Sequence, residues 1–220
     1  MLAPIPGAHH VGVVLRVDIE HTVRLDREVA GAGGAARGIQ AAQRLATGAK
    51  SASDPALLAF FQGLFKNAAP EDINRFTPDA LSALARLVFK RATTRKNGDS
   101  LVDVFTPGAE DKAYDLNESV LVAINDDMPF LFDSLIGELN AQGARLRAVF
   151  HPIIKQDFGT ISVIVAMLDP LPEEKRNALI EGTRAMFAQV RVAVRDWKAM
   201  GAKLLDAVTG LKKHPPRIDA

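Results

Sequence analysis

The stretch "SVLVAINDDMPFLFDSLIGELNAQG", Ser119 to Gly143, decides the fold. Its nearly continuous apolar run, Val120 to Ile124, predicts a central strand. Pro129 to Gln142 predicts a helix, because four large apolar residues recur at helical spacing along one face: Phe132, Leu135, Ile136 and Leu139. Gly143 suits the left-handed residue that ends such a helix. The stretch therefore predicts a strand-to-helix unit with two carboxylates at its turn.

Two further strands and a long helix follow this unit. "ARLRAVFH" alternates, which predicts a strand with Leu146, Ala148 and Phe150 inward and with Arg145, Arg147 and His151 outward. After a turn at Asp157-Phe158-Gly159, "TISVIVAMLD" predicts a second buried strand. A helix then opens at Pro172 and runs to about Val208, and Gly182 and Gly201 weaken it enough that a break into two helices is an alternative. Its seam alternates spacings of three and four: Leu179, Thr183, Met186, Val190, Ala193, Trp197, Gly201, Leu204 and Val208.

This order, β-α-β-β-α, predicts an α+β fold: a ferredoxin-like sandwich with helices on one face of the sheet. The usual last strand is missing, and Leu101 to Phe105 could take its place. Upstream, Asp54-Pro55 and Thr77-Pro78 are helix-start signals that predict a helical hairpin.

We therefore divide the chain into a poorly defined segment (1–50), a helical hairpin (51–96), an α+β domain (97–210) and a tail (211–220). Within the first segment, "GAGGAARG" is typical of a linker. Gly31, Gly33 and Ala36 loosely fit a dinucleotide-binding fingerprint, but the residues before them are not strand-like.

The overall composition excludes several classes of function. The chain has 27 basic and 26 acidic residues, a net charge of +1, which gives no electrostatic case for nucleic acid or a membrane as a partner. No apolar run approaches the ~18 residues that span a bilayer. There is no cysteine, which excludes disulfides, zinc–thiolate sites and cysteine nucleophiles and favours a cytoplasmic location.

Four blocks of sequence, in order, carry a family resemblance that covers about residues 57 to 205. They are "LLAFFQGLFKNAAPEDINRFTPDALSALARLVFKR", "NGDSLVDVFTP", "NDDMPFLFDSLIGELNAQGARLRAVFHPII" and "VRVAVRDWKAM". Together they resemble the amino-terminal region of the large bacterial NAD-specific glutamate dehydrogenases, where the third block lies in an ACT-like domain.

The resemblance implies a regulatory or assembly region. The parent reaction would be oxidation of L-glutamate by NAD to 2-oxoglutarate and ammonia, with NAD and the catalytic residues placed far downstream. We therefore expect this chain to bind no cofactor, to contain no catalytic residue and to be inactive by itself. The implied partners are the rest of the parent enzyme or a second copy of the chain. A stand-alone amino-acid-sensing module and a purely structural oligomerisation module remain alternatives.

The acidic turn allows three interpretations. Asn125, Asp126, Asp127, Met128 and Pro129 could bind an amino-acid ligand, since ACT domains often do so at this turn. Asp127 could instead cap the helix that follows. We favour the cap, because ACT domains resemble "D-x-P-G-L-L" here and Phe130 stands in place of the glycine. Catalysis by the two aspartates ranks third, because adjacent residues at a turn point in different directions.

The remaining candidates are surface features. Trp197, Val190 and Leu204 lie on the seam of the last helix and could form an interface. Arg145 and Arg147 could meet an anion, although a solvated face is the favoured interpretation. His151 has no partner histidine nearby in the sequence, and His9-His10 lacks a third ligand, so no metal site is expected.

Overall fold

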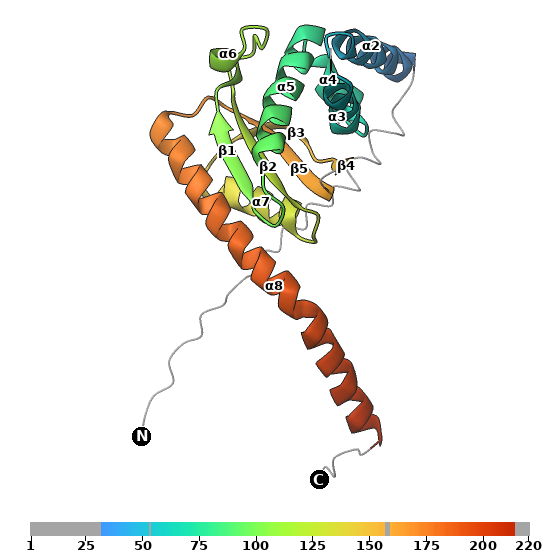
Figure 1. Cartoon of the computed structure of the whole chain (residues 1–220), viewed down its shortest axis with the longest axis vertical. Coiled ribbons are helices and arrows are strands. Elements are labelled where there is room, and N and C mark those ends of the chain that lie inside the picture. The colour runs from blue at the N-terminus through green and yellow to red at the C-terminus, as the bar shows by residue number, and fades with distance from the viewer. Residues whose placement is uncertain (1–31, 53, 157–158, 214–220) are drawn as a thin grey trace, which may run out of the picture.

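The computed structural model describes residues 32–52, 54–156 and 159–213 (Figure 1). The elements follow in the order α2 (Ala32–Ala49), α3 (Pro55–Phe65), α4 (Pro70–Asn74), α5 (Pro78–Thr94), β1 (Leu101–Phe105), α6 (Pro107–Glu110), β2 (Ser119–Asp126), α7 (Leu131–Ala141), β3 (Leu146–Phe150), β4 (Ile153–Gln156), β5 (Gly159–Leu168) and α8 (Glu173–Lys213). Residues 1–31, which include His9-His10 and Gly31, lie outside this part of the chain, as does the turn expected at Asp157-Phe158.

The strands form one antiparallel sheet in the order β1-β2-β5-β3, with β4 also paired to β5. The succession β2-α7-β3-β5-α8 is the expected ferredoxin-like arrangement, so the predicted α+β class is confirmed. β1 pairs with β2 from Leu101↔Ile124 to Phe105↔Val120. It therefore occupies the edge position of the missing last strand, as expected from the sequence.

The apolar run of β2 is continuous because both faces of the sheet are covered. Val120, Val122 and Ile124 pack with the helical layer made by α2–α5, while Leu121 and Ala123 pack with α7 and α8. Successive residues of a strand point to opposite faces, so one run supplies two cores. Helices thus cover two faces and not one as expected, although α7 and α8, which belong to the ferredoxin-like unit, do share a face.

The helix-start signals upstream work as predicted. The side chain of Asp54 accepts a hydrogen bond from the Ala56 N–H, and that of Thr77 accepts one from Ala80. The helical segment does not stand apart, because the helices and the sheet share one core. The division of the chain into separate domains remains a prediction.

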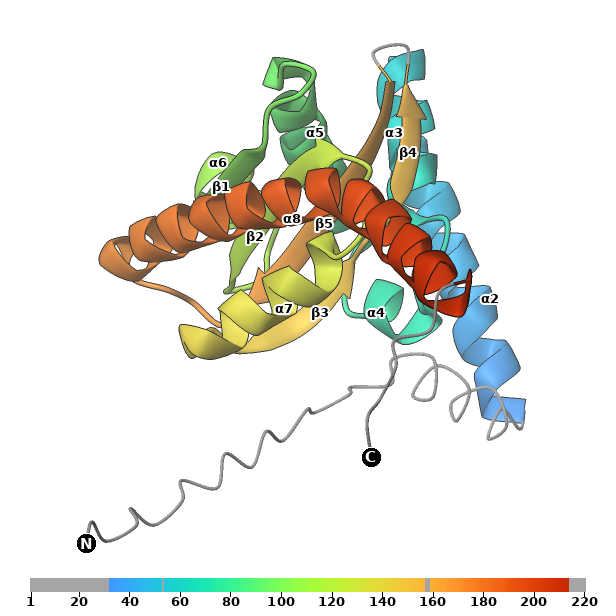
Figure 2. The same cartoon turned by 90° about the horizontal axis from the view of Figure 1, so that it is seen from below.

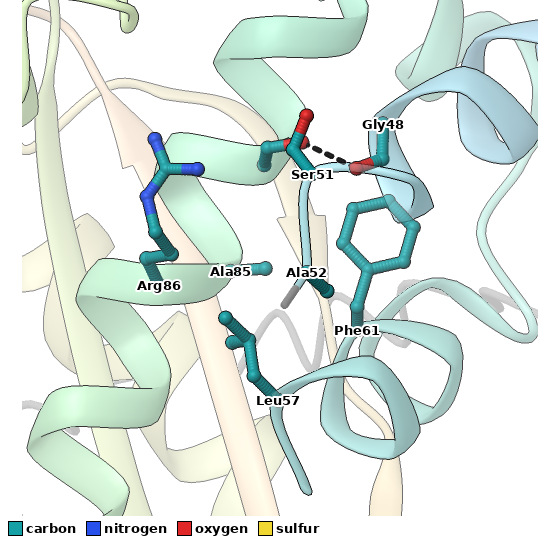
Figure 3. Close-up of a pocket in the computed structure, with 8 residues that line it drawn as sticks. Gly48, Ser51, Ala52, Leu57, Phe61, Ala85 and Arg86 are labelled. Atoms are coloured by element: carbon teal, nitrogen blue, oxygen red, sulfur yellow. Dashed lines mark hydrogen bonds between the residues drawn. The ribbon is translucent and has the colours of Figure 1, made fainter. Parts of the chain in front are cut away.

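The expected linker "GAGGAARG" is wrong, since residues from Ala32 onward form helix α2. Ala41 is buried, and Leu45 and Ala49 pack against the same core, so burial outweighs the glycine cost of about 1 kcal/mol per residue. Gly48 allows α2 to approach α5 closely: a Cβ there would lie 2.9 Å from the carbonyl oxygen of Pro78. Ser82 donates a hydrogen bond of 2.6 Å to the Gly48 carbonyl across this contact (Figure 3).

The gap between α2, α3 and α5 is packing space and not a ligand site. Leu57, Phe61 and Ala85 line it together with the close contact at Gly48 (Figure 3), and it is too small for a water molecule. Its lining belongs to the core that fixes α2 on the domain.

The alternation in β3 is broken by a β-bulge. Leu146 pairs with Leu168 and Ala148 with Met167, so the extra residue Arg147 shifts the register. Ala148 and Phe150 are buried as expected, but Leu146, expected inward, is 37% exposed. A one-residue shift turns a side chain to the other face of the sheet, which explains this error.

Helix α8 is one unbroken helix of 41 residues and extends past residue 211, where the tail was expected to begin. It would be about 60 Å long at ~1.5 Å per residue. Its first half packs on α7 and β1, side by side with α7 in Figure 2, while its second half extends beyond the sheet (Figure 1). Among the described helices, none is long and apolar enough to cross a membrane.

Candidate functional site

The turn between β2 and α7 is built differently from the predicted cap. The N-cap of α7 is Phe130, in the left-handed conformation with φ of 69°, and the helix begins at Leu131. Asp127 as a helix cap is therefore wrong: it lies four residues before the helix, and no side-chain cap hydrogen bond is present. Met128 precedes a proline, which disfavours a helical backbone there, so the start moves past Pro129.

Phe130 adopts the backbone that a glycine would adopt without strain. A left-handed conformation costs a residue with a Cβ roughly 1–2 kcal/mol. The side chain is nevertheless 54% exposed, so apolar burial offsets only part of that cost. Phe130 thus has the left-handed backbone conformation that the glycine of the ACT pattern would adopt at this position. Sequence reasoning treated Phe130 only as a filler of the ligand site.

Asn125 and Asp126 are engaged by the protein itself. Asn125 is fully buried, and its Oδ1 accepts a hydrogen bond from the Ser100 hydroxyl. Asp126 forms an ion pair with Arg95, whose hydrogen bonds hold the pKa of that carboxyl below its usual value. Ser100 in turn accepts a 2.9 Å hydrogen bond from Arg191 of α8. These contacts tie the turn to β1, α5 and α8.

The two aspartates do not form a catalytic pair. Asp126 is held by Arg95, at the end of α5, whereas Asp127 lies near His151, where its charge opposes the lowering of the His151 pKa by burial. The predicted ligand set is thus divided: the structure brings Asn125 and Asp126 to the β1 side, and Asp127, Met128 and Pro129 lead toward α7.

His151 makes a contact that looks catalytic but is structural. Its Nε2 lies 2.9 Å from the Ser162 hydroxyl, the spacing of a base and a nucleophile. Ser162 is only 1% exposed in the middle of β5, so a substrate could not reach it. The imidazole stacks on Phe132, with centroids 5.1 Å apart. Burial lowers the pKa of His151 against the opposing effect of Asp127 and Asp133.

In the part of the chain that the structure describes, no three His, Cys, Asp or Glu side chains are grouped so as to hold a metal ion. The arrangement of polar groups at the turn therefore offers internal hydrogen bonding and no visible centre for chemistry.

A shallow hollow lies next to the turn, between the start of α7 and α8. Phe130, Val190 and Ala193 give it an apolar wall, and Asp133, Ser134 and Gln189 complete its lining. Val190 is buried, so this predicted interface residue belongs to the packing of α8 against α7. The hollow marks the place where α8 leaves the domain.

The other two predicted interface residues lie beyond this point. Trp197 is 61% and Leu204 is 67% exposed. They belong to a larger surface, here called the distal stripe, that sequence reasoning identified only in part: Trp197, Met200, Leu204, Val208 and Leu211. The recurrence at spacings of three and four was the signal for all of it.

Arg147 lies on an exposed face together with Arg145, as expected, but there it pairs with carboxylates of the protein. It makes a 2.6 Å hydrogen bond to Asp169 and lies 3.5 Å from the carboxylate of Glu118, which Arg75 also binds at 3.1 Å. The Glu118 side chain is fully buried, and the Tyr114 hydroxyl donates to it. Burial raises the pKa of Tyr114. Sequence reasoning missed Glu118, because its two charged partners, Arg75 and Arg147, come from distant segments.

Comparison with known families places this fold. A family model described as "Glutamate dehydrogenase, ACT1 domain" matches residues 60–181, from α3 into the first turns of α8. A search of curated protein sequences finds no match. The match spans the second half of α3, α4, α5, the sheet and α7, leaves out α2, and covers a little over half of the chain. The chain therefore belongs to the glutamate dehydrogenase family, whose ACT1 domain it carries.

Proposed function

We propose that this chain is a regulatory and assembly region of a large NAD-specific glutamate dehydrogenase and works in the cytoplasm. The parent enzyme would oxidise L-glutamate with NAD to 2-oxoglutarate and ammonia. NAD would bind elsewhere in the parent, and this chain would position other parts of the enzyme without taking part in the chemistry. The family membership supports the reaction, and the structure of the turn supports the role.

One observation carries the assembly role: the polar groups of the β2–α7 turn are used internally while the apolar surface of α8 points outward. Asn125 binds Ser100, and Asp126 binds Arg95. The Arg95 guanidinium, whose side chain is 2% exposed, already neutralises the Asp126 carboxylate. That carboxylate therefore offers a ligand α-amino group less attraction than an unpaired one would.

The role is tested with a large glutamate dehydrogenase from which the corresponding region has been deleted. Adding the purified chain should restore the native mass of the assembly in light scattering and should change glutamate-dependent NADH formation. The chain alone should form no NADH. An enzyme whose mass and rate are both unaffected by the added chain would contradict the assembly role.

A second candidate function is amino-acid sensing at Asn125, Asp126, Asp127, Met128 and Pro129. One observation favours it: the Nδ2 group of Asn125 is buried and has no hydrogen-bond partner among the described residues. A buried donor without a partner is costly, and a ligand carboxylate would satisfy it if the turn opened, because Asn125 is fully buried. Calorimetry with a panel of amino acids distinguishes the two candidates. Heat that disappears in Asn125→Leu would favour sensing, and no heat with any amino acid would leave assembly.

A further inference from the structure

We propose that the distal stripe of α8 is the contact surface for a second copy of this chain, and that the two α8 helices pair antiparallel about a two-fold axis near Leu204. The inference rests on the proposed assembly role and specifies its partner and geometry. In the distal part of α8, residues 195–197 and 199–213 are all exposed, and this part of the helix extends away from the sheet (Figure 1).

The stripe is symmetric about its centre. Relative to Leu204, Trp197 and Leu211 lie seven residues away on either side, and Met200 and Val208 lie four residues away. Residues at these spacings share one helix face. An isologous interface uses the same patch on both copies. In an antiparallel pair, Trp197 would meet the partner's Leu211, Met200 the partner's Val208, and Leu204 its own copy.

The area of the stripe is sufficient for a specific dimer. Its members are exposed by 61% (Trp197), 66% (Met200), 67% (Leu204), 39% (Val208) and 56% (Leu211), and Leu205 and Phe130 beside it by 69% and 54%. Seven side chains that each offer on the order of 100 Å² give about 700 Å² per chain, close to the ~800 Å² per partner of a standard interface. An apolar patch of this size is larger than monomers usually expose.

The first half of α8 has an antiparallel helix, α7, packed along its seam, and among the described residues the second half has none. α7 lies antiparallel to α8: its carboxyl end reaches Ala178 through Gln142, and its amino end reaches Val190 and Ala193. Past the start of α7 at Phe130, the apolar seam of α8 continues, but α7 no longer covers it. The partner's α8 would run in the same direction as α7 and end where α7 begins, so it would extend that layer.

The charges at this junction are complementary. The carboxyl end of the partner's α8 would face the amino end of α7, which places a negative helix end next to a positive one. Phe130, held outward by its left-handed backbone, would cover the partner's Leu211.

Sedimentation from micromolar to hundreds of micromolar protein tests the dimer, with the single tryptophan, Trp197, as a second probe. We expect a concentration-dependent dimer and a blue shift of Trp197 emission as it forms. Leu204→Glu should weaken the dimer roughly 100-fold or more, as for a central hot spot. The matched control Ala202→Glu, on the opposite face of the same helix, should leave it unchanged. A chain that stays monomeric, or a dimer insensitive to Leu204→Glu, would overturn the inference.

Two further experiments test the two-fold axis and the direction of pairing. A mixture of Leu204→Glu and Leu204→Lys should recover the dimer that each variant alone has lost, because position 204 meets its own copy. Since the chain has no cysteine, a mixture of Trp197→Cys and Leu211→Cys should form a disulfide under oxidation that neither variant forms alone. Cross-linking of Trp197→Cys to itself would show a parallel pair and overturn the proposed geometry. A monomer that still restores the deleted enzyme would overturn the dimer and leave the assembly role standing.

Discussion

The two halves of α8 share one apolar pattern and have different surroundings. In the first half, Leu179 is 1% and Phe187 0% exposed, and three arginines fix the helix to β1 and the loops at its ends: Arg176 to Thr106, Arg184 to the Val102 carbonyl and Arg191 to Ser100. In the second half, Trp197 and Leu204 are mostly exposed. The comparison teaches that helical periodicity identifies a surface that must be covered but does not say by what.

The largest expected effect comes from the same truncation in each half. Leu179→Ala should lower the free energy of unfolding by about 2–5 kcal/mol, because it leaves a cavity in the core. Leu204→Ala should change it by no more than about 0.5 kcal/mol at concentrations where the chain is monomeric. Urea denaturation of both variants measures the difference. Equal losses would mean that the second half is also packed within the monomer.

Phe130 lies beside α8 where its packed half ends. Because of its left-handed backbone, a glycine at this position should be more stabilising than an alanine, which is the reverse of the usual order. Phe130→Gly should be more stable than Phe130→Ala by about 1 kcal/mol, because only glycine accepts a φ of 69° without strain. In the helix interior the order reverses, so Ala202→Gly serves as the control and should destabilise. Thermal unfolding of the three variants provides the measurement. If Phe130→Ala proved more stable than Phe130→Gly, the left-handed cap would be contradicted.

The two halves of α8 should also respond differently when a glycine in each is replaced by alanine. Gly201 has nothing within 4 Å of a built Cβ, so Gly201→Ala should add up to about 1 kcal/mol of helix stability. A Cβ at Gly182 would meet the side-chain ends of Glu138 and Gln142 on α7. Gly182→Ala should therefore gain less, or lose stability, because those side chains must move. Circular dichroism during heating compares the two, and equal gains would place Gly182 outside the contact with α7.

The smallest effect is a pH dependence of stability that arises at His151, which stacks on Phe132 of α7 and lies outside the distal stripe. Burial lowers the pKa of His151, so the unfolded chain binds a proton more readily than the folded one. Stability should therefore be complete above the ordinary histidine pKa of about 6.5 and should fall as the pH drops below it. His151→Gln should remove this dependence in urea midpoints. Residues 195–213 contain no histidine, so dimer formation should not follow the same curve.

Much of the fold was predictable because it depends on local signals. The buried run Val120 to Ile124, the start signals at Asp54 and Thr77 and the periodicity of α7 each act within a few residues. The bulge at Arg147 was not predictable, since it depends on the register with β5. The helix α2 was missed for a related reason: its glycines disfavour a helix locally, and only packing against α4 and α5 compensates.

In the candidate site, too, the local features were predictable and the long-range contacts were not. The residues of the turn were found, but their roles were not, because Arg95, Ser100 and Arg191 reach it from three separate elements. The buried carboxylate of Glu118 shows the same limit, with Arg75 and Arg147 lying 43 and 29 residues away in the chain. Such pairs are set by the fold and leave no pattern in a single sequence.

The α+β class, the strand-to-helix unit at residues 119–143 and the apolar seam of the last helix could all be predicted from local patterns, because periodic burial is a local property of the chain. The fold had to be known before Phe130 and not Asp127 could be placed at the start of α7, before Arg95 could be paired with Asp126, and before α8 could be shown to pass the amino end of α7 with its seam uncovered. Helix ends, ion pairs and exposed faces depend on which distant elements lie beside them.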